Sequence, residues 1–255
     1  MYLRKNFIAM NILFHIGRYF WLLRKIFARP EKHKMYVRQL FYEIEALGID
    51  SIGIVVMISL FIGGILTIQL AYNLVNPLYP TYLIGLGTRD TLILEFSSTM
   101  LGLIMAGKIG SNITSEIGSM KVTEQIDSLE IMGVNSASYL ILPKIIAVVF
   151  IFPFLVVLSI FFGLLGGLLV GPAVGVVSVN EYLDGIRYLF VPYYVTFSLI
   201  KSLFFGFLVS SVPAYFGYFV QGGALEVGKA STRAVVNTNI LILLFDLILT
   251  RMLLT

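Results

Sequence analysis

Five runs of apolar residues, each close to the length that crosses a lipid bilayer, limit this chain to few folds. They cover about Ile52–Ala71, Leu92–Gly107, Tyr139–Gly171, Tyr193–Tyr215 and Ala234–Leu254. A transmembrane helix needs about 20 predominantly apolar residues. Hydrophobic residues make up 58% of the chain and charged residues only 13%, whereas soluble domains carry about 25% charged residues. We therefore expect an all-α integral membrane protein with five transmembrane helices.

The first 50 residues differ from the rest because they mix basic with apolar side chains. Nine of the 18 Lys and Arg residues fall between Arg4 and Arg38. Leu13 and Trp21 stand close to Arg18 in the same segment. Such a mixture is typical of a helix that lies in the membrane interface. We expect residues 1–50 to form a basic amphipathic interfacial region and residues 51–255 to form the five-span domain.

The third apolar run could be one long kinked helix or a tight hairpin of two spans. Between Lys144 and Ser178 the only polar side chain is Ser159, so a hairpin would have no polar turn to expose. Pro153 can kink a membrane helix without ending it. We favour one long span that ends near Gly171-Pro172.

Basic residues predict the orientation of the five spans, because Lys and Arg are enriched on the cytoplasmic side. With the N-terminus inside, the interior segments hold the nine N-terminal residues, three more at Lys108, Lys121 and Lys144, and two at Lys229 and Arg233. The exterior segments hold three, which are Arg89, Arg187 and Arg251. The bias predicts a cytoplasmic N-terminus.

Glu95, Lys201 and Asp246 lie inside predicted spans, where other charges are almost absent. Ionisable residues are costly in hydrocarbon, so they face an interior cavity or each other and usually mark a transport path. One interpretation is a buried charge pair that holds the helices together. The other is a polar patch on a substrate path or a proton relay, and we favour a functional role.

The polar stretch between the second and third spans is predicted to be a helix over about 111–133. Val122, Ile126 and Leu129 fall on one helical side at about 100° per residue. Acidic residues gather on the opposite side, and these are Glu116, Glu124, Asp127 and Glu130. The pattern fits either a solvated connector or a helix that docks a cytoplasmic partner, and periodicity alone does not separate the two.

Other motifs exclude several functions. Gly163, Gly167 and Gly171 are spaced by four, which allows two helices to pack closely in lipid. Two segments match G-x-x-x-x-G-K but lack the Ser or Thr that holds magnesium, having Ile109 and Ala230 instead. The chain has no cysteine and only two histidines, and it shows no catalytic or metal-ligand set and no nucleic-acid module. We expect no catalytic residues, no metal site and no ATP hydrolysis by this chain.

Several motifs together resemble one family of membrane proteins. The central signature comprises four segments, Ala106–Ser111, Glu116–Met120, Thr123–Leu129 and Met132–Val134. Before it stand Phe61–Gly63 and Gln69, and after it stand Leu199–Ser202, Val227–Val236 and Asp246–Thr250. These segments resemble the MlaE/YrbE family of permeases, from about residue 35 to the end of the chain.

The resemblance implies the permease of an ABC-type phospholipid transporter that moves lipids between the inner and outer membranes of a double-membrane envelope. It implies a homodimer in the bacterial inner membrane. It implies two protein partners, a cytoplasmic ABC ATPase that carries ATP and Mg and a periplasmic MCE-domain protein. A small STAS-type cytoplasmic subunit is a further candidate partner. No cofactor is expected on this chain.

The resemblance also assigns roles to particular residues. It places Glu95, Lys201, Phe61, Gln69 and Asp246 near a lipid-binding cavity. It makes the segment 111–133 a coupling helix, whose contacts with the ATPase would involve Glu116, Met120, Thr123, Glu124, Ile126, Asp127, Leu129 and Glu130.

Two other classes of protein remain as alternatives. A proton-coupled secondary transporter would use Glu95, Lys201 and Asp246 as a proton relay and would need no ATPase. A scaffold for membrane assembly would bind no lipid in the purified complex.

Overall fold

The computed structural model describes residues 2–28, 33–74 and 79–254, and the side chains of 13–28, 36–74 and 79–254. The described residues form helices throughout and include five that are long and apolar enough to cross a membrane. These continuous helices are Tyr36–Asn73, Tyr82–Val122, Ser136–Val174, Pro192–Tyr218 and Ala224–Leu254. The prediction of five spans in an all-helical membrane protein is confirmed.

The first and third spans form one pair of closely packed helices. The first span comprises α2 (His33–Glu43), η1 (Ile44–Gly48), η2 (Ile49–Ser51) and α3 (Ile52–Asn73), and the third is α8 (Ser136–Val174). At 1.5 Å per residue, α8 is about 60 Å long, so it extends beyond the apolar layer. Three prolines lie inside it without ending it, and Gly175, at φ 75°, caps it. The preference for one long helix over a hairpin is confirmed.

The second span begins ten residues before the predicted Leu92. It comprises α4 (Tyr82–Thr91), η3 (Leu92–Met100), α5 (Leu101–Met105), η4 (Ala106–Gly110) and α6 (Ser111–Val122), with π-helical turns in η3 and η4. The fifth span, α11 (Ala224–Leu254), begins ten residues before the predicted Ala234. Both differences have one cause, because hydropathy marks only the part of a helix in lipid, whereas the backbone remains helical beyond it.

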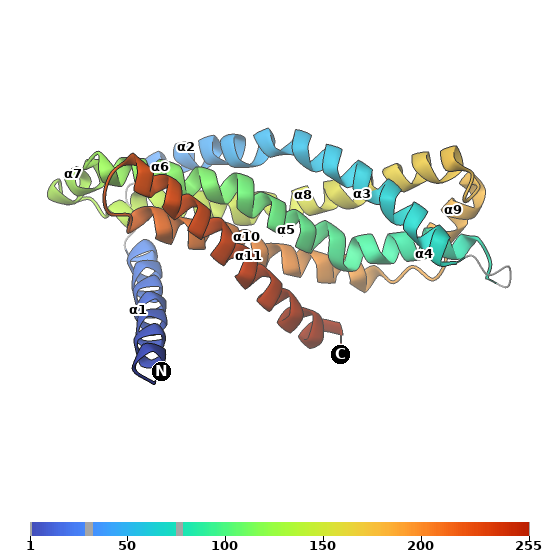
Figure 1. Cartoon of the computed structure of the whole chain (residues 1–255). Coiled ribbons are helices and arrows are strands. Elements are labelled where there is room, and N and C mark those ends of the chain that lie inside the picture. The colour runs from blue at the N-terminus through green and yellow to red at the C-terminus, as the bar shows by residue number, and fades with distance from the viewer. Residues whose placement is uncertain (1, 29–32, 75–78, 255) are drawn as a thin grey trace.

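The predicted single helix over 111–133 is wrong in one respect, because two helices cover this segment. The second span continues through α6, and a separate helix, α7 (Gln125–Ile131), follows it. The break falls at Thr123 and Glu124, where Glu124 has the left-handed φ of 60°. The change of direction places α7 at the far end of the bundle (Figure 1).

The two ends of the bundle carry different elements. The α6–α7 end lies opposite the end formed by α4 and α9 (Val179–Arg187), with α10 (Pro192–Tyr218) running between them (Figure 1). The helix α1 (Tyr2–Phe27) lies across the bundle axis at the α7 end. Its buried Leu22 and Ile26 join the main hydrophobic core.

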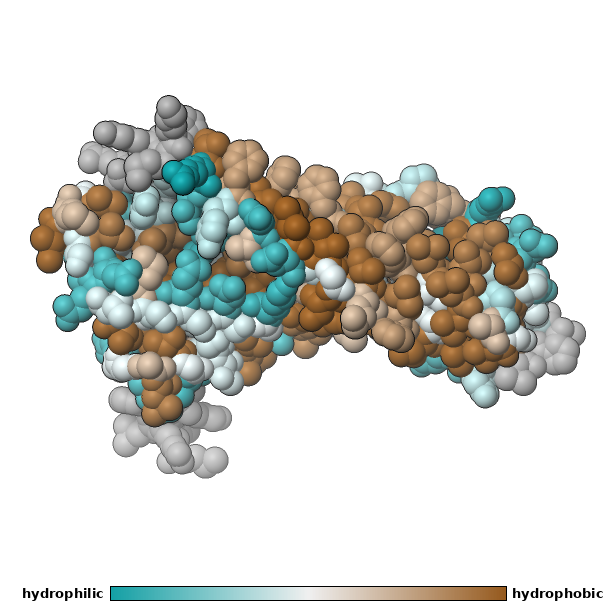
Figure 2. All heavy atoms as spheres, turned by 90° about the horizontal axis from the view of Figure 1, so that it is seen from above, coloured by the Kyte–Doolittle hydropathy of each residue, from teal (hydrophilic) through white to brown (hydrophobic). Residues whose placement is uncertain are grey.

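Apolar side chains cover the middle of the molecule on the face drawn in Figure 2, whereas hydrophilic residues gather near its two ends. Large apolar side chains such as Phe61 on α3, Phe154 on α8 and Leu247 on α11 are more than half exposed. Soluble proteins rarely expose so much contiguous apolar surface. The surface therefore fits a bilayer around the middle of the bundle.

Candidate functional site

Lys201 is the centre of a charged cluster formed by three elements. Its ammonium lies 3.0 Å from Glu95 Oε2 and 2.5 Å from Asp246 Oδ1. Lys201 comes from α10, Glu95 from the π-helical turn η3 and Asp246 from α11. π-Helical turns inside α-helices occur frequently at functional sites. The structure therefore brings together the three intramembrane charges that the sequence singled out.

Neighbouring oxygens complete the bonding of this cluster. The Lys201 ammonium also donates to the carbonyl of Leu94 at 3.2 Å and to the Thr250 hydroxyl at 3.4 Å. Thr99 Oγ1 lies 3.0 Å from Asp246 Oδ1 and 3.3 Å from Glu95 Oε2. A buried charge is tolerated only when it is paired and its remaining bonds are satisfied. The Lys201 ammonium meets both conditions.

The three charged residues differ in their access to the surface. The Lys201 side chain is 0% exposed, the Asp246 side chain 16% and the Glu95 side chain 40%. Glu95 is therefore the member of the cluster most open to an approaching molecule, whereas Lys201 is fully covered. The binding of a phosphate by Lys201 stays a prediction. In this arrangement, a phosphate would have to take the place of one of the groups that bind the Lys201 ammonium.

Phe61 and Gln69 lie apart from this cluster. Both are exposed residues of α3, and α3 packs mainly against α8 and α4. The Lys201 cluster is formed by η3, α10 and α11 instead. Within one copy of the chain, these two predicted cavity residues and the charged cluster belong to different faces of the bundle.

The glycine strip of α8 packs inside the chain. A Cβ atom on Gly63 of α3 would lie 1.7 Å from the carbonyl oxygen of Gly163. A Cβ atom on Gly167 would lie 2.1 Å from the Tyr182 hydroxyl, and one on Gly171 would lie 2.7 Å from Val177. These approaches leave no room for a side chain. The strip therefore sets the spacing between α3, α8 and α9.

Lys144 also lies between two carboxylates, in a second cluster that no pattern in the sequence indicated. Its ammonium lies 2.8 Å from Glu43 Oε1 and 2.7 Å from Glu116 Oε2. Gln39 donates to Glu43 at 2.8 Å. Glu43 is 1% exposed, Lys144 is 2% exposed and the Glu116 side chain is 43% exposed. The cluster joins α2, α8 and α6, so it ties a predicted coupling residue to the first and third spans.

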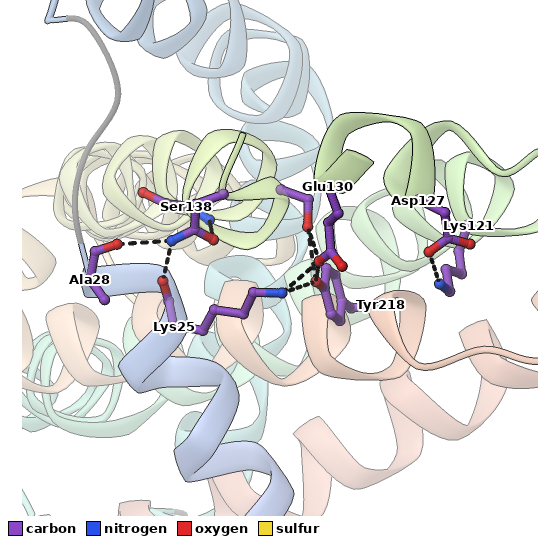
Figure 3. Close-up of polar contacts among 9 residues, drawn as sticks. Lys25, Ala28, Lys121, Asp127, Glu130, Ser138 and Tyr218 are labelled. Atoms are coloured by element: carbon purple, nitrogen blue, oxygen red, sulfur yellow. Dashed lines mark hydrogen bonds and ion pairs between the residues drawn. The ribbon is translucent and has the colours of Figure 1, made fainter. Parts of the chain in front are cut away.

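Glu130 of α7 links four helices at the same end of the bundle (Figure 3). It accepts hydrogen bonds from Lys25 of α1 at 2.5 Å, and from Ser136 of α8 and Tyr218 of α10 at 2.8 Å each. The Lys25 ammonium, followed by these hydroxyl groups, lowers the pKa of Glu130 to about 2. Glu130 is therefore ionised at neutral pH, and it connects α7 with α1.

The remaining predicted coupling residues divide into packed and exposed groups. Ile126 is buried, and Met120 and Leu129 are half-buried. Asp127 pairs with Lys121 at 2.6 Å, while Thr123 and Glu124 are exposed at the break between α6 and α7. Beyond them, Ile131 and Met132 are 87% and 68% exposed and form an apolar tip that the sequence analysis did not identify.

Metal-binding geometry is absent among the residues that the structure describes, since no three His, Cys, Asp or Glu side chains are grouped to hold an ion. His15 Nδ1 instead lies 2.7 Å from the Tyr215 hydroxyl. The side chain of His33 lies outside the described residues.

A helical protein with five spans and charges buried between them belongs to the class of multi-pass membrane transport subunits. The chain belongs to the MlaE permease family, because the family model Permease MlaE matches residues 40–252. It is therefore the membrane subunit of an ABC-type transporter and not its catalytic subunit.

Individual relatives agree with this family. The chain is 32% identical to the intermembrane phospholipid transport system permease protein MlaE of Haemophilus influenzae, over 91% of this chain and 88% of the relative. It is 33% identical to a probable ABC transporter permease protein of Rickettsia bellii, over 90% and 87%. It is 29% identical to the chloroplastic protein TRIGALACTOSYLDIACYLGLYCEROL 1 of Arabidopsis thaliana, over 88% of this chain and 64% of that protein.

Proposed function

We propose that this chain moves phospholipids between the inner and outer membranes of a double-membrane envelope. The cluster around Lys201 carries the proposal, because it places one ammonium and two carboxylates inside the spans and leaves Glu95 partly open to the surface. An amphiphile carries its charges at one end and apolar chains at the other. The headgroup would lie at the cluster, and the acyl chains would lie along apolar span surfaces.

The cluster supplies a chemical step for headgroup capture. Lys201 is held by two carboxylates, so a phosphate can replace Glu95 while Asp246 remains bound to the ammonium. Because Glu95 is the more exposed partner, it can leave the ammonium at a lower cost. Phe61 and Gln69, on another face of the bundle, would reach such a cavity only from a second copy of the chain.

Two copies and several partners complete the proposed transporter. The α7 end of each copy would dock a cytoplasmic ATPase that carries ATP and Mg, and this chain would bind no cofactor. Because Asp127 and Glu130 are paired inside the chain, the exposed Ile131 and Met132 are the better docking residues. The α4–α9 end would face a periplasmic MCE-domain protein, and a STAS-type subunit is a further partner at the cytoplasmic end.

The proposal can be tested by reconstituting the complex with its ATPase in vesicles that contain a fluorescent phospholipid. We expect ATP-dependent transfer to acceptor vesicles that an ionophore does not stop. Lys201→Gln should reduce transfer at least tenfold, by analogy with the loss of a buried charge-assisted bond. Lys229→Gln, at an exposed lysine of α11 paired with Glu226, is the matched control and should keep transfer intact.

Three results would contradict the proposal. Transfer driven by a proton gradient without ATP would favour the secondary transporter. No transfer, together with no phospholipid in the purified complex, would favour the scaffold. Equal transfer by Lys201→Gln and the unmodified chain would remove the cluster from the mechanism.

A further inference from the structure

Two adjoining surface cavities, the larger of them wide open, lie where α1 meets the end of α10. The larger has a volume of about 630 Å³ and is lined mainly by apolar residues, namely Leu13, Phe14, Gly17, Arg18, Trp21 and Phe219. The smaller has a volume of about 270 Å³ and shares Arg18, Trp21 and Phe219 with it. The smaller cavity adds the polar side chains of Lys25, Lys121, Glu130, Tyr218 and Gln221. An apolar cavity therefore opens directly into a charged one.

The charges of the polar cavity favour an anion. Arg18, Lys25 and Lys121 line it, against the single carboxylate of Glu130. Lys121 also pairs with Asp127, which leaves one positive charge in excess. Glu130 does not lose its charge near neutral pH, since the Lys25 ammonium holds its pKa down at about 2.

Arg18 is the cation available for a ligand. Its guanidinium carbon lies 3.7 Å from the centroid of the Phe219 ring and 5.9 Å from that of Phe14. No carboxylate of the described side chains forms an ion pair with it. Stacking on an aromatic face holds an arginine in place and leaves its N–H groups free to donate.

The position of α1 indicates what reaches these cavities. The helix lies across the bundle axis (Figure 1), and Leu13, Phe14 and Trp21 are more than half exposed. We expect a helix with this placement and these exposed residues to lie in the headgroup region of a leaflet. Lipid of that leaflet would then have direct access to both cavities.

We propose that α1 and α10 form a binding site for an anionic phospholipid of the leaflet at the α7 end. The phosphate would lie against Arg18 in the polar cavity, and one acyl chain would lie beside Leu13, Phe14 and Trp21. The charge excess selects an anionic over a zwitterionic headgroup. This site is separate from the Lys201 cluster and does not depend on the proposed transport function. Its bound lipid would hold α1 on the bundle beside α7.

Trp21 lines both cavities and is the only tryptophan of the chain, so its fluorescence reports this site alone. The full chain is placed in phosphatidylcholine nanodiscs that contain a minor fraction of brominated phosphatidylglycerol or brominated phosphatidylcholine. Bromine on an acyl chain quenches tryptophan on contact. We expect brominated phosphatidylglycerol to quench Trp21 with about fivefold higher affinity, the effect of one basic residue near a membrane surface.

Variants of α1 distinguish a specific binding site from general attraction of anionic lipid by surface charge. Arg18→Gln should remove the preference for phosphatidylglycerol, and Arg18→Lys should keep most of it. Arg24→Gln changes the same charge at an exposed residue of α1 that lines neither cavity, and it should keep the preference.

Several results would overturn the proposal. Equal quenching by the two brominated lipids in the unmodified chain would show contact with bulk lipid only. Equal loss of preference in Arg18→Gln and Arg24→Gln would show general electrostatic attraction. No quenching by either lipid would show that protein, such as a second copy of the chain, fills the groove.

Discussion

Lys144 and Lys201 each lie between two carboxylates, in two clusters at different levels of the bundle. Each lysine is almost fully buried and holds two carboxylates, and one of them, Glu116 or Glu95, is about 40% exposed. The clusters differ in the second carboxylate, because Glu43 beside Lys144 is 1% exposed whereas Asp246 beside Lys201 is 16% exposed. The Lys144 cluster is sealed on one side, and the Lys201 cluster has some access to the surface from both carboxylates.

The difference separates a structural from a functional use of the same charges. A sealed ion pair fixes the helices that supply it, because breaking it leaves a charge without solvent. A partly open pair can exchange a partner at a lower cost. We therefore infer that the Lys144 cluster holds α2, α6 and α8 together while the Lys201 cluster changes its bonds during transport.

The largest expected effect on stability is that of Lys144→Met. This change leaves Glu43 buried without a counter-charge, which costs about 3–5 kcal/mol in other buried pairs. Thermal unfolding of the purified complex should show the loss, and Glu43→Gln in the same chain should recover part of it.

A matched control for this prediction is Lys121→Met. Lys121 pairs with Asp127, but their side chains are 30% and 49% exposed. Exposed pairs contribute about 0–1 kcal/mol, so this variant should unfold close to the unmodified chain. Similar losses in Lys121→Met and Lys144→Met would contradict a special role for the sealed cluster.

Lys201→Met should destabilise the chain by about 2 kcal/mol, which is less than the loss expected for Lys144→Met. The reason is that partial solvent access reduces the cost of an unpaired carboxylate. Its effect on lipid transfer should be the larger of the two, with transfer lost while the complex remains assembled. Unfolding and transfer measured on the same preparations test the comparison. A variant that unfolds as easily as Lys144→Met would show that both clusters are structural.

The two exposed carboxylates allow a finer comparison. Glu95→Gln and Glu116→Gln each remove the partly exposed partner of a buried lysine, and each should cost about 1 kcal/mol or less. Glu95→Gln should reduce lipid transfer and leave ATP hydrolysis unchanged. Glu116→Gln, close to the proposed ATPase contact, should lower the amount of lipid moved per ATP hydrolysed. The reverse pattern would contradict the assignment of the two clusters.

The sequence predicted the spans well because a membrane requires long apolar runs, and hydropathy reports such runs directly. It also singled out Glu95, Lys201 and Asp246, since charge inside an apolar run is conspicuous. It assigned Lys144 only to the cytoplasmic side. Lys144 and Glu43 are 101 residues apart, and no local pattern connects residues so distant. The only local sign of the Lys144 cluster in the sequence was the position of a lysine near the start of a long apolar run.

The break between α6 and α7 could not be predicted for a different reason. Glu124 adopts a left-handed conformation, which costs a residue other than Gly about 1–2 kcal/mol. Helix ends of this kind usually carry Gly or Asn, and neither occurs at Thr123 or Glu124. The packing of Ile126 against the core overrides the local preference, and packing is a property of the folded chain.

The smallest expected effect concerns pH and the contact between α1 and α7. The pKa of Glu130 lies at about 2 in the folded chain, below its ordinary value of 4.5. A carboxyl group whose pKa is lowered by folding stabilises the folded chain at pH values above its pKa in the unfolded chain. This contribution to stability is lost as the pH drops from about 4.5 toward 2. Trp21 lies near Lys25, with 5.5 Å between the Lys25 ammonium and its ring, so its emission should change over this pH range.

Two variants test whether Glu130 causes this change. Glu130→Gln should abolish the transition of Trp21 emission, because Gln cannot titrate. Glu226→Gln removes another carboxylate, on the first turn of α11, whose pKa is lowered by its hydrogen bond from Lys229. This variant should leave the transition in place. A transition that persists in Glu130→Gln would arise from general acid unfolding. In that case α1 would be held mainly by the burial of Leu22 and Ile26, and the ion pair would contribute little.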